Sequence, residues 1–353
     1  MTKSEQLLSA FSEDYFFKEL VLDNLHFIPE GSSKIELADL IINLGDIILA
    51  VQLKERNYEN QTNDPVSENN WLKDRCKEAK KQVKRSLDLI SSGALPAFQN
   101  KRGQGVYLQS DAKIIPLVVF DNNQITDYPH ILRKHSDSGM DISCMSFPDY
   151  CEMCRILVTP MEIIEYLEYR KAIYVEHGDI DFMILNGHDN EIVLTKPQSK
   201  ESLVHQFLAE KYGMKESKKH ALCIQYFRNF LHLLPERTVR SSDQSSAYYV
   251  LLFLAHMQRY EVAEFWDVLE ATKREAKQGG TGIRHSLRHD ISEYIILFMA
   301  NGLIPVEALL PIIRRKTNPK RVLEIEVRWF DEDAYGIDFL YWDHTSSINT
   351  GEG

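Results

Sequence analysis

The sequence predicts an α/β domain over residues 1–175 and a mainly α-helical domain over residues 176–353 that ends in a β-hairpin. Two observations point to the first domain. Two apolar runs are joined by a tight turn between 35 and 53, and another apolar run lies at 113–121. A third observation points to the second domain, where successive stretches after residue 200 have helical spacing. The expected first domain is an α/β core of helices and strands.

The first expected element is an amphipathic helix, or two short ones, over residues 4–25. Ser4 stands where an N-cap is expected, and the leucines and aromatic residues that follow supply an apolar face. Glu19 lies within this pattern and would approach the sheet if that face packs there. Pro29 to Ser33 then interrupts the chain before the hairpin.

The hairpin spans Lys34 to Asn57, which reads KIELADLIINLGDIILAVQLKERN. Its turn signal is Asn43-Leu44-Gly45-Asp46. Polar side chains interrupt two otherwise apolar strands, since Asp39 lies in the middle of the first and Gln52 and Lys54 lie late in the second. Residues two apart on a strand project to one face, so Gln52 and Lys54 are expected to lie side by side near Asp39.

These three side chains suit a divalent metal beside a phosphate. A carboxylate and an amide carbonyl are hard oxygen ligands for Mg²⁺. An ammonium group stabilises developing negative charge or orients an attacking water. The other interpretation is a hairpin whose charged residues are simply solvated.

The stretch resembles the PD-(D/E)xK, or restriction-endonuclease-like, nucleases. Their signature is an Asp on one strand and (Asp/Glu/Gln)-x-Lys on the next, matched here by Asp39 and Gln52-Leu53-Lys54. The Pro that often precedes the Asp is Ala38 in this chain. A Gln in place of the acid is similar to the Mrr-like variant of the family.

The resemblance covers roughly residues 4–160 and implies further site residues. The family often adds a Glu from the first helix, a place that Glu19 fits, and the Mrr-like group carries a Gln on the helix after the hairpin, where Gln82 stands. It also implies a restriction-endonuclease-like mixed sheet, a Mg²⁺ or Mn²⁺ cofactor, DNA cleavage, and a role in restriction or antiviral (anti-phage) defence.

Residues 57–70 are polar and are expected to form a loop, and Trp71 to Ser91 a helix, because apolar residues recur there at helical spacing. The other faces of this helix carry the densest group of basic residues in the chain. They make it the candidate surface for a phosphate backbone, with a solvated helix as the plain alternative. The candidate nucleic-acid contacts are Lys73, Lys77, Lys80, Lys81, Gln82 and Lys84.

The rest of the chain is interpreted by the same patterns. A buried strand is expected at 113–121, where Pro116 favours a bulge or an edge position, and another at 141–145. Further helices are expected at 147–157, 160–174, 201–212, 217–234, 244–259, 261–277, 286–301 and 305–315. Two hairpins are expected, one at 181–195 and a closing one at 321–329 and 336–342.

Composition limits the classes of function. The net charge of −11 argues against general binding of polyanions, so a nucleic acid would contact a local basic surface. No apolar run reaches the roughly 18–20 residues of a membrane span. The N-terminal stretch lacks a signal-peptide hydrophobic region, and five cysteines do not suit a secreted disulfide framework. The chain is expected to be cytoplasmic, with no membrane contact.

The resulting hypothesis is a metal-dependent endonuclease that hydrolyses phosphodiester bonds, in DNA rather than RNA. Asp39, Gln52 and Glu19 would hold the metal, and Lys54 would position water and neutralise charge. Two alternatives stay open. One is a catalytically silent nuclease-fold module that binds nucleic acid or a protein. The other is an assembly factor that acts through the helical domain, with a protein partner or as a homo-oligomer.

Overall fold

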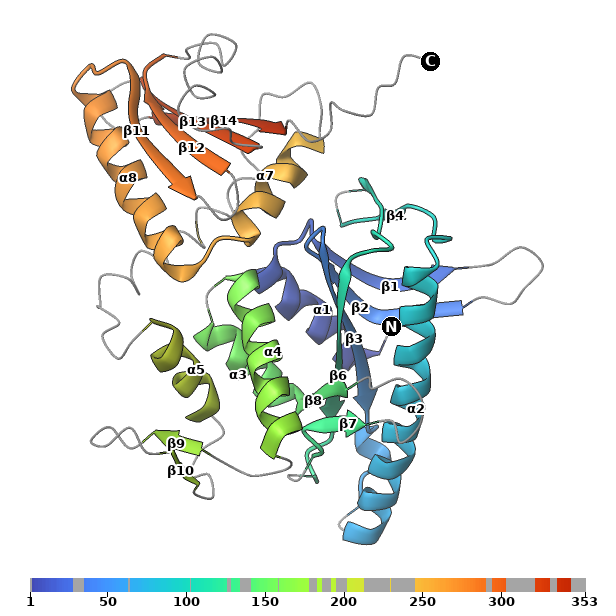
Figure 1. Cartoon of the computed structure of the whole chain (residues 1–353). Coiled ribbons are helices and arrows are strands. Elements are labelled where there is room, and N and C mark those ends of the chain that lie inside the picture. The colour runs from blue at the N-terminus through green and yellow to red at the C-terminus, as the bar shows by residue number, and fades with distance from the viewer. Residues whose placement is uncertain are drawn as a thin grey trace. The chain divides into compact units, whose positions relative to one another are not determined.

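The computed structural model shows a mixed α/β protein, drawn in Figure 1. It describes residues 2–27, 35–62, 64–101, 103–125, 128–133, 141–157, 159–177, 183–185, 192–194, 202–212, 229, 245–289, 294–302, 321–330 and 335–343. The chain divides into two units, Met1–Glu216 and Ser217–Gly353, which are described separately.

The first unit is built on a six-stranded mixed sheet with the order β1-β2-β3-β6-β8-β7. β1, β2 and β3 are antiparallel neighbours, whereas β3, β6 and β8 run parallel and end at one edge of the sheet. β7 is antiparallel to β8. The strands are β1 (Val21–Phe27), β2 (Ile35–Asn43), β3 (Ile47–Glu55), β6 (Lys113–Asp121), β7 (Ile131–Arg133) and β8 (Asp141–Ser146).

Helices cover both faces of this sheet (Figure 1). The long α2 packs on one face, where Leu72, Ala79 and Val83 meet Val118 and Phe120 of β6. α1 and α3 lie on the other and are joined by a 2.8 Å hydrogen bond between the hydroxyls of Ser12 and Tyr150. The helices are α1 (Lys3–Phe16), η1 (Tyr58–Asn60), α2 (Pro65–Ser91), α3 (Phe147–Ile156), α4 (Pro160–His177) and α5 (Ser202–Tyr212).

Two expectations for the N-terminal part are wrong. The helix expected over 4–25 ends at Phe16, and Val21–Phe27 form edge strand β1 instead, because Leu20, Leu22 and Leu25 are buried in the core. α2 also begins six residues early, within the expected loop. Asp64 caps it by accepting from the backbone N–H groups of Val66 and Ser67, and Pro65 occupies its first turn.

β6 is the centre of the parallel part of the sheet, so the expected buried strand at 113–121 is confirmed. Pro116 is neither at an edge strand nor at a bulge. The ladder to β8 begins only at Leu117, so β6 has no partner on that side at Pro116. The expected strand at 141–145 and the expected helices at 147–157 and 160–174 are confirmed as β8, α3 and α4.

The first unit reaches further along the chain than the boundary expected after residue 175, because α5 packs on α4. The ring of Phe207 lies 5.6 Å from that of Tyr166, and Lys211 forms an ion pair with Glu165. The expected hairpin at 181–195 is confirmed as two short antiparallel strands. The remaining short strands of the unit are β4 (Phe98–Gln99), β5 (Gly105–Val106), β9 (Met183–Leu185) and β10 (Ile192–Leu194).

The described part of the second unit is a four-stranded sheet with the order β11-β12-β13-β14 and two helices. α8 packs across β12 and β13, where the rings of Phe265 and Phe298 lie 5.3 Å apart. The elements are α7 (Ser245–Ala255), α8 (Arg259–Lys277), β11 (Gly282–His289), β12 (Tyr294–Ala300), β13 (Arg321–Trp329) and β14 (Tyr335–Asp343).

The expectation of a mainly helical second half is therefore wrong for its described part. Of the stretch 286–301, residues 286–289 belong to β11 and residues 294–300 form β12, and neither is helical. The apolar run in β12 is buried on both faces of the sheet, and such a run has no period that separates strand from helix. The expected helices at 201–212, 244–259 and 261–277 and the closing hairpin are confirmed. The stretch 305–315, and 217–234 apart from position 229, lie outside the described residues.

None of the helices within the described ranges is long and apolar enough to cross a membrane.

Candidate active site

The β2–β3 hairpin opens at the position of Asp39. Its backbone pairing runs from Asn43 and Ile48 to Leu40 and Val51 and stops there. Beyond that point the backbone N–H of Leu53 donates to Asp39 Oδ2 at 2.7 Å. A carboxylate from one strand thus binds the backbone of the other where the ladder ends.

Gln52 lies inside the same opening and is buried. Its side-chain Nε2 donates to the backbone oxygen of Leu37 at 3.5 Å, and the Ser86 hydroxyl of α2 donates to that same oxygen. With its nitrogen donating to Leu37, the side-chain oxygen of Gln52 is the acceptor of the amide group.

Lys54 projects from the end of β3 toward α2 and is also buried. Its ammonium group donates to Gln82 Oε1 and forms a 3.3 Å ion pair with Glu78 Oε1. Glu78 is shared, because it also pairs with Arg75 one turn earlier. The two α2 residues, four apart on one helix face, therefore hold the lysine at the carboxyl edge of the sheet.

The electrostatics of the opening are seen at Asp39, whose carboxyl group is buried near other charged side chains. The pKa of Asp39 is raised from 3.8 to about 6, chiefly by burial, and the nearby carboxylates of Glu36 and Glu5 contribute less in the same direction. The hydrogen bond from Leu53 and the charge of Lys54 act in the opposite direction. At neutral pH Asp39 is ionised, and a cation beside it would stabilise this charged form.

Glu19 is not part of this site. It is buried in the turn between α1 and β1. The adjacent Leu20 backbone oxygen accepts from the N–H of Asn43, at the turn end of β2. Asn43 lies four residues along β2 from Asp39, roughly 13 Å on a strand. The prediction that Glu19 supports Asp39 fails because the helix ends before it.

Glu5 takes the place that the sequence analysis gave to Glu19. It lies in the first turn of α1 and is close enough to raise the pKa of Asp39. Thr2 and Glu5 form a capping box, in which the Thr2 N–H donates to Glu5 Oε2 at 2.7 Å and Thr2 Oγ1 accepts from the Glu5 N–H at 3.2 Å. The Thr-x-x-Glu spacing was the signal that could have placed the helix start, and with it Glu5, at the site.

A cavity of about 490 Å³ opens beside Lys54. α1, the end of β3 and α2 form its walls, and both Glu5 and Glu78 line it. Asp39 and Gln52 do not line this cavity, whereas Leu53, whose N–H donates to Asp39, does. The remaining lining residues are Thr2, Glu55, Asn57 and Arg75.

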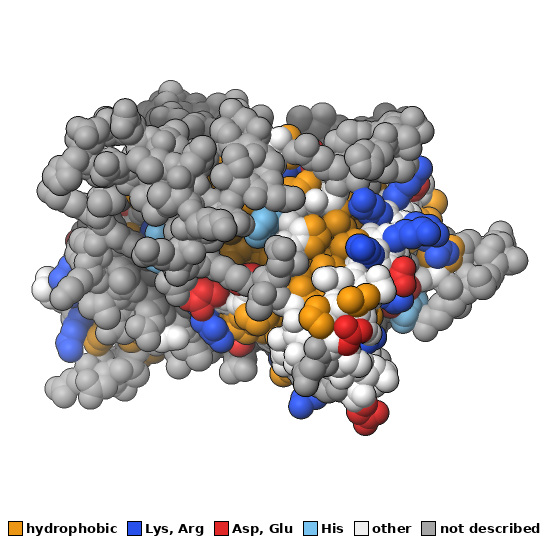
Figure 2. Space-filling view, turned by 90° about the horizontal axis from the view of Figure 1, so that it is seen from below, with side chains coloured by type: hydrophobic (Ala, Val, Ile, Leu, Met, Phe, Trp, Pro, Cys, Tyr) orange, Lys and Arg blue, Asp and Glu red, His pale blue; other side chains and the backbone are white. Residues whose placement is uncertain are grey.

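The six candidate nucleic-acid contacts on α2 differ in their exposure to solvent. Lys73, Lys77, Lys81 and Lys84 are exposed, whereas Lys80 is partly buried. Gln82 is half-buried, and its side-chain oxygen accepts a hydrogen bond from the Lys54 ammonium group. Figure 2 shows that Lys and Arg side chains gather on one side of the described surface, beside a band of hydrophobic side chains.

The donor set of the opening is small for a metal ion. Among the described residues, no group of three or more His, Cys, Asp and Glu side chains is arranged to hold one. The oxygen donors that the opening offers are the Asp39 carboxylate and the Gln52 amide, with Glu5 nearby. Hard oxygen donors fit Mg²⁺ or Mn²⁺ better than a softer metal.

Comparison of the chain with protein-family models, with curated proteins and with solved structures found no match.

Proposed function

We propose that the first unit has a restriction-endonuclease-like fold of the PD-(D/E)xK type and hydrolyses phosphodiester bonds in DNA with Mg²⁺ or Mn²⁺. The observation that carries the proposal is the opened hairpin, in which Asp39, Gln52 and Lys54 converge on one edge of a mixed sheet. The approach of α2, with Gln82 bound to Lys54, supports it further. A role in restriction or anti-phage defence rests on the family resemblance alone.

Asp39 and Gln52 would hold the metal ion through side-chain oxygens, with Glu5 in support. A bound divalent cation would supply Lewis-acid chemistry and lower the pKa of a bound water. Lys54 would stabilise the negative charge that develops on the phosphate, because a buried ammonium group acts in a medium of low dielectric constant. Glu78 and Gln82 restrict the ammonium to one position before substrate arrives.

The exposed lysines of α2 would contact the nucleic-acid backbone. They lie on the helix that holds Lys54, so a duplex resting on α2 would bring a phosphate near the cavity. Contacts of this kind carry no sequence information by themselves.

The first test is cleavage of plasmid DNA and of structured RNA by the full chain with Mg²⁺ or Mn²⁺. Lys54→Ala and Asp39→Ala are expected to lower the cleavage rate by about a hundredfold or more. Lys18→Ala and Asp88→Ala are matched controls at exposed positions and are expected to leave it unchanged. Cleavage that survives both site substitutions would exclude this site.

The second candidate is a silent nuclease fold that binds nucleic acid without cutting it. Gln52 in place of an acid and the small donor set favour it. In that case no form would cleave, calorimetry would detect no Mg²⁺ binding, and DNA binding would survive Asp39→Ala.

A further inference from the structure

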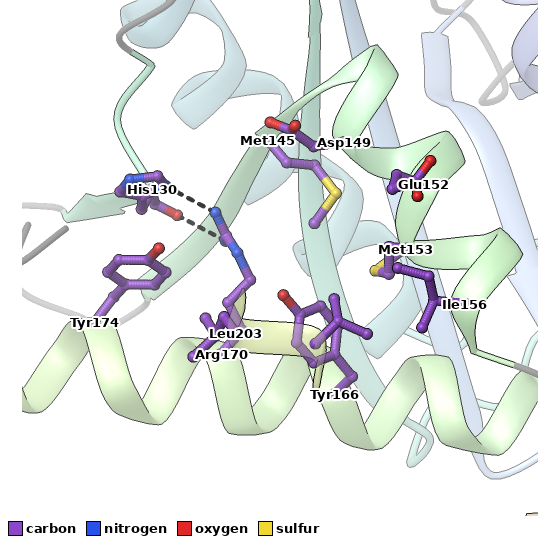
Figure 3. A pocket seen from close by; sticks show the side chains of 11 residues that line it. His130, Met145, Asp149, Glu152, Met153, Ile156, Tyr166, Arg170, Tyr174 and Leu203 are labelled. Carbon is purple, nitrogen blue, oxygen red and sulfur yellow. Dashed lines mark hydrogen bonds between the residues drawn. The ribbon is translucent and has the colours of Figure 1, made fainter. Parts of the chain in front are cut away.

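The first unit contains a second cavity, on the face of the sheet away from Lys54. β8 forms its floor at Met145, which alternates with Cys144, a residue that faces α2. The cavity has a volume of about 80 Å³ and is lined by residues of α3, α4 and α5. Figure 3 shows Tyr166 and Leu203 at its sides and Arg170 at one end.

Arg170 is held in a fixed position at this end, with only 6% of its surface exposed. Nη1 donates to the backbone oxygen of His130 at 3.3 Å, and Nη2 donates to His130 Nδ1 at 2.9 Å. The guanidinium lies 4.8 Å over the ring of Tyr174, which in turn stacks on His130 at 4.2 Å. Three contacts, from the two residues His130 and Tyr174, therefore fix the orientation of the guanidinium.

None of these partners is an anion. Within the described residues, no carboxylate forms an ion pair with Arg170. A guanidinium group carries five donors in a planar fork that matches a carboxylate, and two of these donors are used. Burying such a charge without a counter-charge is unfavourable, so an anion that enters the cavity would gain the interaction that the protein itself does not supply.

The other residues that line the cavity limit the charge and the size of the anion. Asp149 and Glu152 also line the cavity, and Glu152 pairs with the exposed Arg155 at 3.5 Å. These carboxylates repel a ligand with several negative charges. Met145, Met153 and Leu203 offer apolar contact instead. A water needs about 15 Å³ of such space, so 80 Å³ holds roughly five heavy atoms.

We propose that this cavity binds a short-chain monocarboxylic acid of the size of propionate or butyrate. The carboxylate pairs with Arg170, and the alkyl chain lies against the two methionines. The site is independent of the nuclease proposal, because it lies on the opposite face of the sheet.

The test uses the full chain labelled with ¹³C at the methionine methyl groups, titrated with butyrate. The signals of Met145 and Met153, assigned by substitution to Leu, are expected to shift and to saturate with a Kd of about 1 mM. Met257 and Met299, buried in the second unit, serve as internal references. Neutral butyramide is expected to cause no shift.

Arg170→Gln is expected to remove the butyrate response, whereas Arg155→Gln, at an exposed arginine, is expected to keep it. Leu203→Phe narrows the cavity and leaves the guanidinium in place. It is also expected to remove the response, and it tests the proposal even if Arg170→Gln does not fold. A response that persists in both variants, equals that of butyramide, or is weaker than that of inorganic phosphate would overturn the proposal, as would the absence of any shift.

Discussion

Asp39 stands where the β2–β3 ladder ends, and burial raises the pKa of its carboxyl group to about 6 from 3.8. The folded state thus binds the proton more tightly than the unfolded state does. Its contribution to stability is present in full below pH 4 and is lost as the pH rises through 6. At neutral pH the ionised carboxylate destabilises the fold, which is the expected property of a group kept for cation binding.

Asp39→Asn is therefore expected to raise the free energy of unfolding at pH 8, by at most about 3 kcal/mol for a shift of two pKa units. The amide oxygen still accepts from Leu53, so the loss of charge is the main change. The gain should shrink as the pH falls toward 4, and metal-dependent cleavage should disappear. Urea unfolding at several pH values measures the first effect.

The exposed Asp111, which precedes β6 and is not among the groups that act on Asp39, is the control for Asp39→Asn. Asp111→Asn is expected to change stability by less than about 0.5 kcal/mol. A variant at Asp39 that is less stable than the wild type at pH 8 would contradict the assignment of the raised pKa.

Individual site residues were predictable to different degrees. Asp39, Gln52 and Lys54 could be found because a hairpin fixes which residues of its two strands lie close together. The position of Glu19 could not be predicted from strand pairing. It depended on where a helix ends, and periodicity marks helix ends poorly. Glu78 carries no signal in the sequence at all, since a charged residue on a helix is usually solvated.

At the scale of elements, α2 connects the candidate site to the sheet through its N-terminal turns. Glu68 is buried there and accepts from Arg56, from the Thr62 N–H and from Asn122 Nδ2, at 3.2, 3.0 and 2.7 Å. These partners hold the pKa of Glu68 below its usual value. The start of α2 is thereby attached to the chain that follows β3 and β6.

Loss of the α2 N-cap is expected to weaken this attachment. Asp64→Ala leaves the N–H groups of Val66 and Ser67 without their acceptor and should lower the free energy of unfolding by about 1 kcal/mol. Asp74→Ala, at an exposed position inside the same helix, should have an effect below about 0.5 kcal/mol. Equal effects in urea unfolding would show that the cap contributes nothing.

The elements that the sequence predicted best are those whose apolar pattern extends over many residues. The strands of the hairpin are mostly apolar, and the body of α2 has one mostly apolar face. β1 and β12 were missed because a short apolar run fits a strand and a helix equally well, and only its partners decide. β1 is a strand because it pairs with β2, and β12 because it lies between β11 and β13.

At the scale of the whole molecule, the net charge of −11 opposes any nucleic acid except where cations are concentrated. The exposed lysines of α2 provide such a concentration. Binding to DNA should therefore depend steeply on salt, with a slope set by the number of lysines that contact phosphates.

Lys77→Gln is expected to reduce the slope of log K against log salt concentration by about 1. Lys18→Gln, in the turn after α1, removes the same charge away from α2 and should leave the slope unchanged. Fluorescence anisotropy with a labelled duplex over a range of salt measures both. Equal slopes for the two variants would place the backbone contact elsewhere.

The turn between β2 and β3 has a consequence for how this chain tolerates insertions and deletions. Gly45 adopts a φ of 81°, its N–H donates to Asn43 Oδ1, and the Leu44 N–H donates to the Ile47 oxygen. One residue more or fewer would shift β2 along β3 by about 3.4 Å and turn Asp39 to the opposite face. Descendants of this sequence can therefore vary the composition of the turn, but a change in its length would destroy the candidate site without altering any residue in it.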